Sequence, residues 1–323
     1  MKIIQQHHIR KYITWRDWFV EVLRKIVLPG FEGVPLYDVL VFFINGLFKG
    51  SISVRAAAIA FSFFLAIFPF ILFIFTLIPY IPIANFQTSL LDLFAEIIPP
   101  DTYVMVEKTI FEIVTKQNSG LLSLSFLLTF IFSTNGISAI IDGFNGSWHI
   151  TETKTWIQQR LIAIFLMVIL SFLVVLAIAL ITMGSTFIDW MIDKRLVASD
   201  FTVILLEIIQ WIITLALTFF SVSFLYYFGP ARRKEYHFFS PGSILSTALL
   251  ILGTLGFNYY ITNFSNYNAL YGSIGTLIIF LIWLFFNAFI LMIGFELNVS
   301  IAKAKAGSIH PINSLTHSLP ENE

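Results

Sequence analysis

Six long apolar stretches, separated by short polar segments, dominate the order of residues along the chain. They cover roughly residues 56–83, 120–141, 161–183, 203–228, 240–261 and 274–301. A helix needs about 20 residues to cross the hydrocarbon core of a bilayer, which is about 30 Å thick. Because lipid offers no hydrogen bonds to the backbone, each stretch should be an α-helix. The pattern therefore predicts an all-α, polytopic membrane protein built as a six-transmembrane-helix bundle.

The first stretch contains the prolines Pro69, Pro79 and Pro82. A straight helix over the whole stretch would be longer than the hydrocarbon core, since each residue adds about 1.5 Å. Proline removes a backbone donor and bends or ends a helix. We therefore expect a kink near Pro69 and an outer end broken at Pro79 and Pro82.

Three segments lie outside the six stretches. Residues 1–55 should form cytoplasmic, interfacial amphipathic helices, because bulky apolar residues recur there at helical spacing with basic residues between them. The outer segment after the first stretch should hold short helices that either cap the bundle or act as a gate. The tail, residues 303–323, is polar and is predicted to be disordered.

The composition agrees with a membrane protein. Hydrophobic residues make up 58% of the chain and charged residues only 12%, whereas soluble domains carry about 25% charged residues. Of the 19 Lys and Arg residues, 15 fall on one side of a six-span topology and four on the other. Because positively charged loops stay in the cytoplasm, both termini should be cytoplasmic. The chain has no cysteine, which excludes disulfides, and we expect no cleavable signal peptide.

The fourth apolar stretch carries a polar stripe. The side chains that recur on one helical face are Glu207, Gln210, Thr214, Thr218 and Ser221. Lipid cannot satisfy such groups, so the stripe should face the protein interior. One interpretation is hydrogen bonding between helices, and another is the wall of a cavity or substrate path. A third is that Glu207 only reaches the outer interface.

A second stripe follows the end of the second stretch and comprises Asn135, Ser138, Asp142, Asn145 and His149. It either marks the point at which the helix leaves the membrane or lines an inward-facing vestibule. Together the two stripes would form a path that is polar from the outside along the fourth stretch and from the inside along the second.

Small residues occupy one face of the fifth stretch, namely Gly242, Ser246, Gly253 and Gly256. Small faces let helices approach closely, so we expect helix packing here. A groove that holds an acyl chain is the alternative. Gly272 and Gly275, at the start of the sixth stretch, belong with Pro69 to the same class of helix-break and packing positions.

Glu296 lies near the cytoplasmic end of the sixth stretch. A carboxylate at this depth must reach water or find a basic partner. We expect an ion pair at the inner rim, with Arg55 or Arg232 as the partner. The basic cluster Arg232–Lys234 should set the topology and attract anionic headgroups.

Several of these residues stand in patterns that resemble one family. The patterns are Arg55-Ala56-Ala57-Ala58, Phe68-Pro69, Phe144-Asn145 with Trp148, Pro241-Gly242, Tyr271-Gly272-Ser273-Ile274-Gly275, Trp283 and Gly294-Phe295-Glu296-Leu297-Asn298. Their order over about residues 50–302 is similar to that of the YihY/BrkB family. The resemblance implies a bacterial inner-membrane protein with about six spans. The ribonuclease BN label once given to the family is regarded as mistaken, and the resemblance supplies no catalytic residues.

The residues also argue against an enzyme. None of the six His residues forms an HxH or HxxxH pair, and no GxSxG or HExxH motif occurs. A metal-dependent nuclease needs clustered carboxylates or His, and RNA binding needs a broad basic surface. We therefore expect no cofactor, no metal and no nucleic acid.

These features favour a transporter or flippase-like protein that moves an amphipathic or lipidic envelope substrate. Membrane lipids and such a substrate are its expected partners. The alternative is a structural or regulatory subunit of an envelope complex, whose polar stripes only pack. In either case the partner protein would be a second copy of the chain or another envelope protein.

Overall fold

The computed structural model describes residues 17–81, 87, 91, 108, 110–112, 115–147, 154–193, 200–231, 236–264 and 273–309. Its main helices are α2 (Leu36–Lys49), α3 (Ile52–Leu77), α6 (Ser119–Asn145), α7 (Trp156–Asp193), α8 (Asp200–Phe228), α9 (Pro241–Phe264) and α11 (Ser273–Ile309). The described residues form no strands. Among them, 6 helices are long and apolar enough to cross a membrane. The predicted all-α fold with six spans is thereby confirmed for this part of the chain.

The first span begins earlier than expected and passes through its first proline. Helix α3 starts at Ile52 and continues through Pro69 to Leu77. The 3₁₀-helix η1 (Ile78–Tyr80) follows, with Pro79 in its first turn. A membrane helix tolerates an internal proline when neighbouring groups satisfy the freed carbonyl. The span therefore ends near Pro79, while Pro82 lies outside the described residues and the kink at Pro69 stays a prediction.

The last helix is longer than the sequence suggests. Helix α11 continues to Ile309. The tail was predicted to be disordered from residue 303, and this prediction is wrong for residues 303–309. Ile301 and Ala304 pack against Phe31, Val34 and Val39 in a small apolar cluster. Lys305 also forms an ion pair with Glu32. These contacts come from residues far away in sequence, and they hold the end of α11 in helical form.

The N-terminal segment packs on the bundle as well as presenting apolar side chains outward. Residues 17–25 are helical, and Trp18 and Phe19 on this helix are exposed. Helix α2, by contrast, lies against the C-terminal half of α11. Most of the outer segment after the first span lies outside the described residues. Helix α6 begins beyond it, where the Asn118 side chain accepts a capping hydrogen bond of 2.9 Å from the backbone of Leu121.

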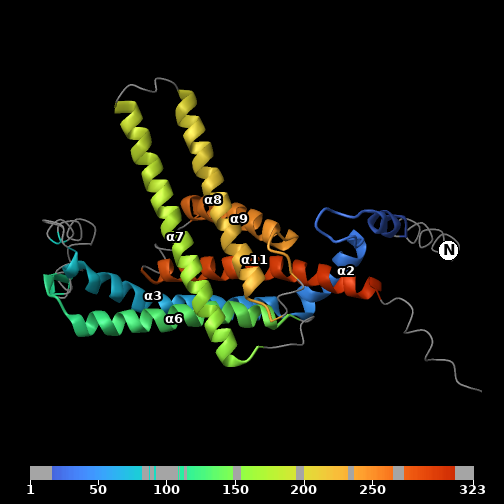
Figure 1. Ribbon diagram of the computed structural model, residues 1–323, viewed down its shortest axis with the longest axis horizontal. Helices are drawn as coiled ribbons and strands as arrows, with labels where there is room; N and C mark the ends of the chain where they lie inside the picture. Colours follow the sequence, from blue (N-terminus) through green and yellow to red (C-terminus); the bar gives the residue numbers. More distant parts are fainter. Residues whose placement is uncertain are drawn as a thin grey trace, which may run out of the picture.

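Helices α3, α6 and α11 lie side by side in one layer, with α2 beside the end of α11 (Figure 1). Helices α7 and α8 form a hairpin that crosses this layer at a steep angle and projects beyond it. Helix α9 packs between α8 and α11. The helices therefore converge at one end of the molecule and splay apart at the other.

Buried side chains concentrate where the helices converge. We call this the inner end, because the charge distribution predicts it to be cytoplasmic. There Phe144 of α6 and Phe295 of α11 stack with 4.2 Å between ring centroids, and Tyr226 of α8 meets Phe144 edge-on. Farther out, Phe172 of α7 and Ile212 of α8 are 64% and 60% exposed. Such exposure is expected of helices in lipid, where apolar surface has no water to avoid.

Candidate functional site

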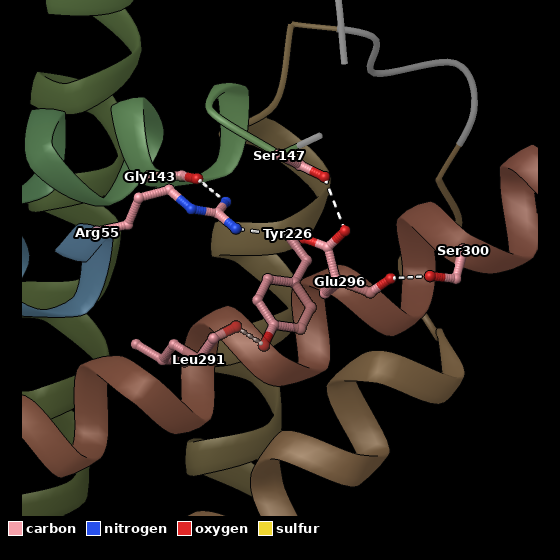
Figure 2. A network of polar contacts seen from close by, with 7 residues as sticks. All are labelled: Arg55, Gly143, Ser147, Tyr226, Leu291, Glu296 and Ser300. Carbon is pink, nitrogen blue, oxygen red and sulfur yellow. Dashed lines mark hydrogen bonds and ion pairs between the residues drawn. The ribbon is translucent and has the colours of Figure 1, made fainter. Parts of the chain in front are cut away.

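A buried carboxylate lies at the centre of the inner end. The Glu296 side chain is 0% exposed, and its Oε2 atom lies 3.5 Å from Nη2 of Arg55. Its other oxygen, Oε1, accepts a hydrogen bond of 3.0 Å from the Ser147 hydroxyl. Figure 2 shows these side chains reaching from α3, from the end of α6 and from α11 toward one point. The structure thus brings together Arg55 and Glu296, the two residues expected at the inner rim, whereas Arg232 lies outside the described residues.

Arg55 makes a stronger contact elsewhere. Its Nη1 donates a hydrogen bond of 2.6 Å to the backbone carbonyl of Gly143 on α6. Its Nε is buried and has no hydrogen-bond partner among the described residues. A buried ion pair repays the desolvation of its charges only when its remaining donors and acceptors are satisfied. Within the described residues this pair is therefore incompletely satisfied.

Glycines let the surrounding helices close on this pair. A Cβ atom on Gly46 of α2 would lie 2.1 Å from Oε1 of Glu296, and one on Gly50 would lie 2.9 Å from Nη2 of Arg55. On α6, a Cβ atom on Gly143 would lie 3.0 Å from Ile59. No larger residue fits at Gly46 without moving α2 or the carboxylate. The backbone at Gly46 and Gly50 therefore lies directly against the charged pair, while Gly143 lets α3 and α6 approach each other.

A second polar cluster joins α8, α9 and α11. The Tyr226 hydroxyl donates to the carbonyl of Leu291 at 2.7 Å and lies 2.5 Å from the hydroxyl of Ser246. Close by, the Gly242 backbone donates to Oδ1 of Asn298 at 2.8 Å. A Cβ atom on Gly294 would lie 1.8 Å from the Ser246 hydroxyl. Here α9 and α11 cross almost backbone to backbone.

The small face of α9 serves packing over only part of its length. Cβ atoms on Gly242 and Gly253 would lie 2.1 Å from the Gly294 carbonyl and 2.6 Å from Phe286. A Cβ atom on Gly256 would meet nothing within 4 Å among the described residues, so the packing role of Gly256 stays a prediction. The helices separate beyond Gly253. Gly275 is buried near the start of α11, and Gly272 lies outside the described residues.

The stripe on α8 borders a hollow. Thr214 and Thr218 line a space of about 320 Å³ together with Thr254 of α9 and Asn287 of α11. The hydroxyls of Thr214 and Thr218 donate to the carbonyls of Gln210 and Thr214, at 2.9 and 2.8 Å, within their own helix. They are therefore not used to join α8 to its neighbours.

Ser221 and Gln210 of this stripe do not line the hollow. The Ser221 hydroxyl donates to the Leu217 carbonyl at 2.8 Å, which is again a bond within α8. Gln210 is exposed. Glu207 is part of α8, but its side chain lies outside the described part of the structure. Of the stripe side chains that the structure describes, Thr214 and Thr218 are thus the two that line this hollow.

A second hollow continues the first toward the splayed end. It has a volume of about 540 Å³ and is lined by α9 and α11, including Asn258, Thr276 and Trp283. Thr254 and Leu255 line both spaces. We call the two together the α8–α9–α11 groove. Its walls are mostly apolar, with a few Thr and Asn side chains along its length.

The stripe on α6 is used differently. Asn135 accepts a hydrogen bond of 2.5 Å from Arg160 at the start of α7, and Asp142 accepts one of 2.6 Å from Gln159. Asn145 accepts one of 3.0 Å from the backbone of Ala231, after α8. The backbone carbonyl of Ser138 also accepts from Gln159, at 3.5 Å. Most of this stripe therefore joins helices, while His149 lies outside the described residues.

Asp142 also borders a cavity at the inner end. This cavity has a volume of about 410 Å³ and lies between the end of α2, the start of α3 and the end of α6. Lys49 and Arg55 line it as well. Asp142 is the one described residue of the α6 stripe that lines this cavity, and the vestibule stays a prediction.

Several polar residues of these sites were not predicted. Ser147 and Gln159 act through partners that are distant in sequence, and no periodic pattern marks them. Asn287 and Thr254 stand alone within long apolar runs, and a search for single polar residues in the spans would have found them. Gly46 lies in a short helix that resembles an ordinary interfacial segment. Only the position of Glu296 shows why a glycine is needed there.

Comparison with known proteins places the chain among bacterial membrane proteins. The family described as virulence factor BrkB matches residues 44–313. A Bacillus subtilis protein named "Putative ribonuclease-like protein YfkH" is 28% identical over 251 residues, which cover 78% of this chain and 90% of the relative. A UPF0761 membrane protein of Haemophilus influenzae is 23% identical over 245 residues, covering 75% of this chain and 87% of its own. A UPF0761 membrane protein of Idiomarina loihiensis is 24% identical over 209 residues, which cover 65% of this chain and 70% of the relative. No solved structure matches the chain.

Proposed function

Because the chain belongs to the virulence factor BrkB family of multi-pass membrane proteins, we propose that it acts on the membrane itself, as a transporter or flippase-like protein for an amphipathic or lipidic substrate. The observation that carries this proposal is the α8–α9–α11 groove. It lies within the membrane-spanning part of the bundle and is lined by apolar and weakly polar side chains.

The chemistry of the groove suits an amphipathic molecule. Thr214 and Thr218 donate their hydroxyl protons to their own helix, so their oxygen lone pairs are available to accept a hydrogen bond from a ligand. The Asn287 amide likewise donates to the Trp283 carbonyl at 2.7 Å, which leaves its oxygen free to accept. A surface of this kind binds an apolar chain by contact and a hydroxyl or amide weakly. Weak binding allows a substrate to leave as well as enter.

The length of the groove suits an acyl chain. Its α9 wall runs from Leu250 to Ile261, which corresponds to roughly 16 Å at 1.5 Å per residue. That is about half of the 30 Å hydrocarbon core, or the depth of one leaflet. The groove is also lined by exposed apolar residues, such as Leu255 and Trp211. A lipid chain in the surrounding leaflet therefore has a direct way in.

One observation favours the second candidate, a structural subunit without transport. The polar residues of the α6 stripe join α6 to α7 through hydrogen bonds, as a packing role requires. The α8 stripe does not share this property, because its hydroxyls bond within α8. We therefore prefer transport for the groove and a structural role for the α6–α7 contact.

We also propose that the chain is not a ribonuclease, although one relative is named ribonuclease-like. The described residues contain no group of three or more His, Asp or Glu placed to hold a metal ion. What supports the proposal is that the polar groups of the groove lie inside the membrane span, where RNA has no access. Purified protein incubated with RNA and Mg²⁺ or Mn²⁺ tests this directly. Metal-dependent RNA cleavage that increases with the amount of wild-type protein would overturn it.

Reconstitution in liposomes tests the transport proposal. The probe is fluorescently labelled phosphatidylglycerol or phosphatidylethanolamine, and its movement between leaflets is followed by quenching from outside. Thr254→Trp should fill the junction of the two hollows and slow the movement at least fivefold. Thr262→Trp, at an exposed position near the end of the same helix, is the matched control and should have little effect. Equal rates for empty liposomes and wild-type protein would favour the structural subunit.

A further inference from the structure

The cavity at the inner end has features that the proposed transport does not use. It is separate from the α8–α9–α11 groove and is lined by α2, α3 and α6. Two of its residues, Lys49 and Arg55, carry positive charge, and Lys49 lies exposed at the end of α2. A space of about 410 Å³ is large enough for a phosphate group with its first substituents. We propose that this cavity binds a phosphate-type anion, held between Lys49 and Arg55.

The donor groups needed for such a ligand are present. Arg55 uses Nη1 on the Gly143 carbonyl, but its Nη2 reaches Glu296 only at 3.5 Å and its Nε has no partner among the described residues. Guanidinium groups are common phosphate binders in proteins because their N–H donors carry positive charge. The buried Nε cannot reach a ligand, so the weakly engaged Nη2, which lies beside Gly50 of the cavity wall, is the Arg55 donor that a ligand would use. Lys49 adds a second positive charge from the rim.

The backbone at the start of α3 adds to the positive potential. Gly50 and Ser51 line the cavity directly before the first turn of α3. Ser51 has a positive φ of 48°, and its side chain makes no capping hydrogen bond. The positive end of the α3 dipole is thus not compensated by the residue that usually caps it.

The carboxylates near the cavity do not cancel this charge. Asp142 lines the cavity, but it is exposed and accepts a 2.6 Å hydrogen bond from Gln159. Glu296 lies behind Arg55 and is completely buried, so it does not line the cavity. It competes with a ligand for the same guanidinium. Among the described residues, the cavity therefore presents two cations and one exposed carboxylate to an incoming anion.

Because Glu296 competes with the anion for Arg55, changes at positions 296 and 49 should shift the anion affinity in opposite directions. A neutral side chain at position 296 frees Nη2 of Arg55, so Glu296→Gln should tighten anion binding. Lys49→Gln removes one of the two cations and should weaken it. Variants that only disturb folding would weaken binding in both cases. Opposite effects of these two changes are expected only if the anion binds at Arg55.

Calorimetric titration of the full-length protein in dodecyl maltoside tests the site. One arm uses inorganic phosphate, and the other uses short-chain phosphatidylglycerol in the same micelles. We expect saturable binding that Lys49→Gln weakens at least fivefold, while Lys25→Gln has no effect. Lys25 is an exposed lysine that pairs with Glu21, outside the cavity, and so controls for loss of charge.

The two arms separate the sources of the phosphate group. Binding of inorganic phosphate alone identifies a soluble anion, and binding of the lipid alone identifies a headgroup at the membrane surface. Either result supports the site if Lys49→Gln weakens it. Absence of binding in both arms, or equal binding by wild type and Lys49→Gln, overturns it. Neither outcome depends on whether the groove moves a lipid, because no transport is measured.

Discussion

Glu296 of α11 and Gly46 of α2 approach so closely that a Cβ atom on Gly46 would lie 2.1 Å from the carboxylate oxygen Oε1. The carboxylate is buried, and backbone rather than water covers it. Among the described residues, the groups that reach it and balance its charge are Arg55 and Ser147. This contact ties an amphipathic helix near the N-terminus to the last membrane span.

Breaking the buried pair should cost more than removing it. Arg55→Met or Glu296→Met alone leaves one charge buried without a partner, and we expect each to lower the free energy of unfolding by about 3–5 kcal/mol. The double variant removes both charges and should recover most of that loss. Thermal unfolding in detergent measures all three proteins. Single variants as stable as wild type would show that water already reaches the pair.

Alanine should destabilise the protein at one helix glycine and be tolerated at another. Gly294→Ala would place a methyl group 1.8 Å from the Ser246 hydroxyl and force α9 away from α11. Such overpacking costs about 1–3 kcal/mol. Gly256→Ala, where the same atom meets nothing within 4 Å among the described residues, should cause no loss of stability. Equal destabilisation by both changes would contradict the crossing geometry.

The hydroxyl of Tyr226 should contribute to stability. Tyr226→Phe leaves the Leu291 carbonyl and the Ser246 hydroxyl without this partner inside the bundle. Losing a buried hydrogen bond in this way costs about 1–3 kcal/mol. Tyr37→Phe, which keeps the ring that Arg24 contacts, is the control and should be near neutral. The comparison is made by chemical or thermal unfolding of the purified proteins.

Labelling of single cysteines checks the orientation in the membrane. The natural chain has no cysteine, so each introduced thiol is unique. Lys25 and Lys116 are both exposed. Lys25 precedes the first span, and Lys116 lies between the first span and the second. With cytoplasmic termini, a membrane-impermeant maleimide should label Lys116→Cys in intact cells but reach Lys25→Cys only after lysis. The reverse pattern would place the inner end outside the cytoplasm.

Much of the fold was predictable because membrane insertion is governed by local composition. A run of about 20 apolar residues must be helical in lipid whatever its neighbours are. The spans were therefore predicted to within a few residues, except at the ends of α7 and α11, which extend to Asp193 and Ile309. At the end of α11, packing against Val34 and Val39 decides the length, and composition does not report it.

The candidate sites were predictable only in part. Periodicity identified the polar face that contains Thr214 and Thr218, but not whether a helix or a hollow lies opposite. It identified Gly242 and Gly253 as packing positions and also Gly256, at which a Cβ atom would meet nothing within 4 Å among the described residues. A single-helix pattern cannot show the distance to the next helix.

The sequence alone determined the class of the protein, the number of spans and that Glu296 needed a basic partner, for which it offered Arg55 or Arg232. The tertiary structure decided that α2 covers the carboxylate, that Lys49 and Arg55 border one cavity, and that Thr214 faces a groove. The physical reason is that insertion into lipid depends on the apolar composition of each segment by itself. Hydrogen bonds, charge pairs and cavities depend on the distances between segments, which only the tertiary structure sets.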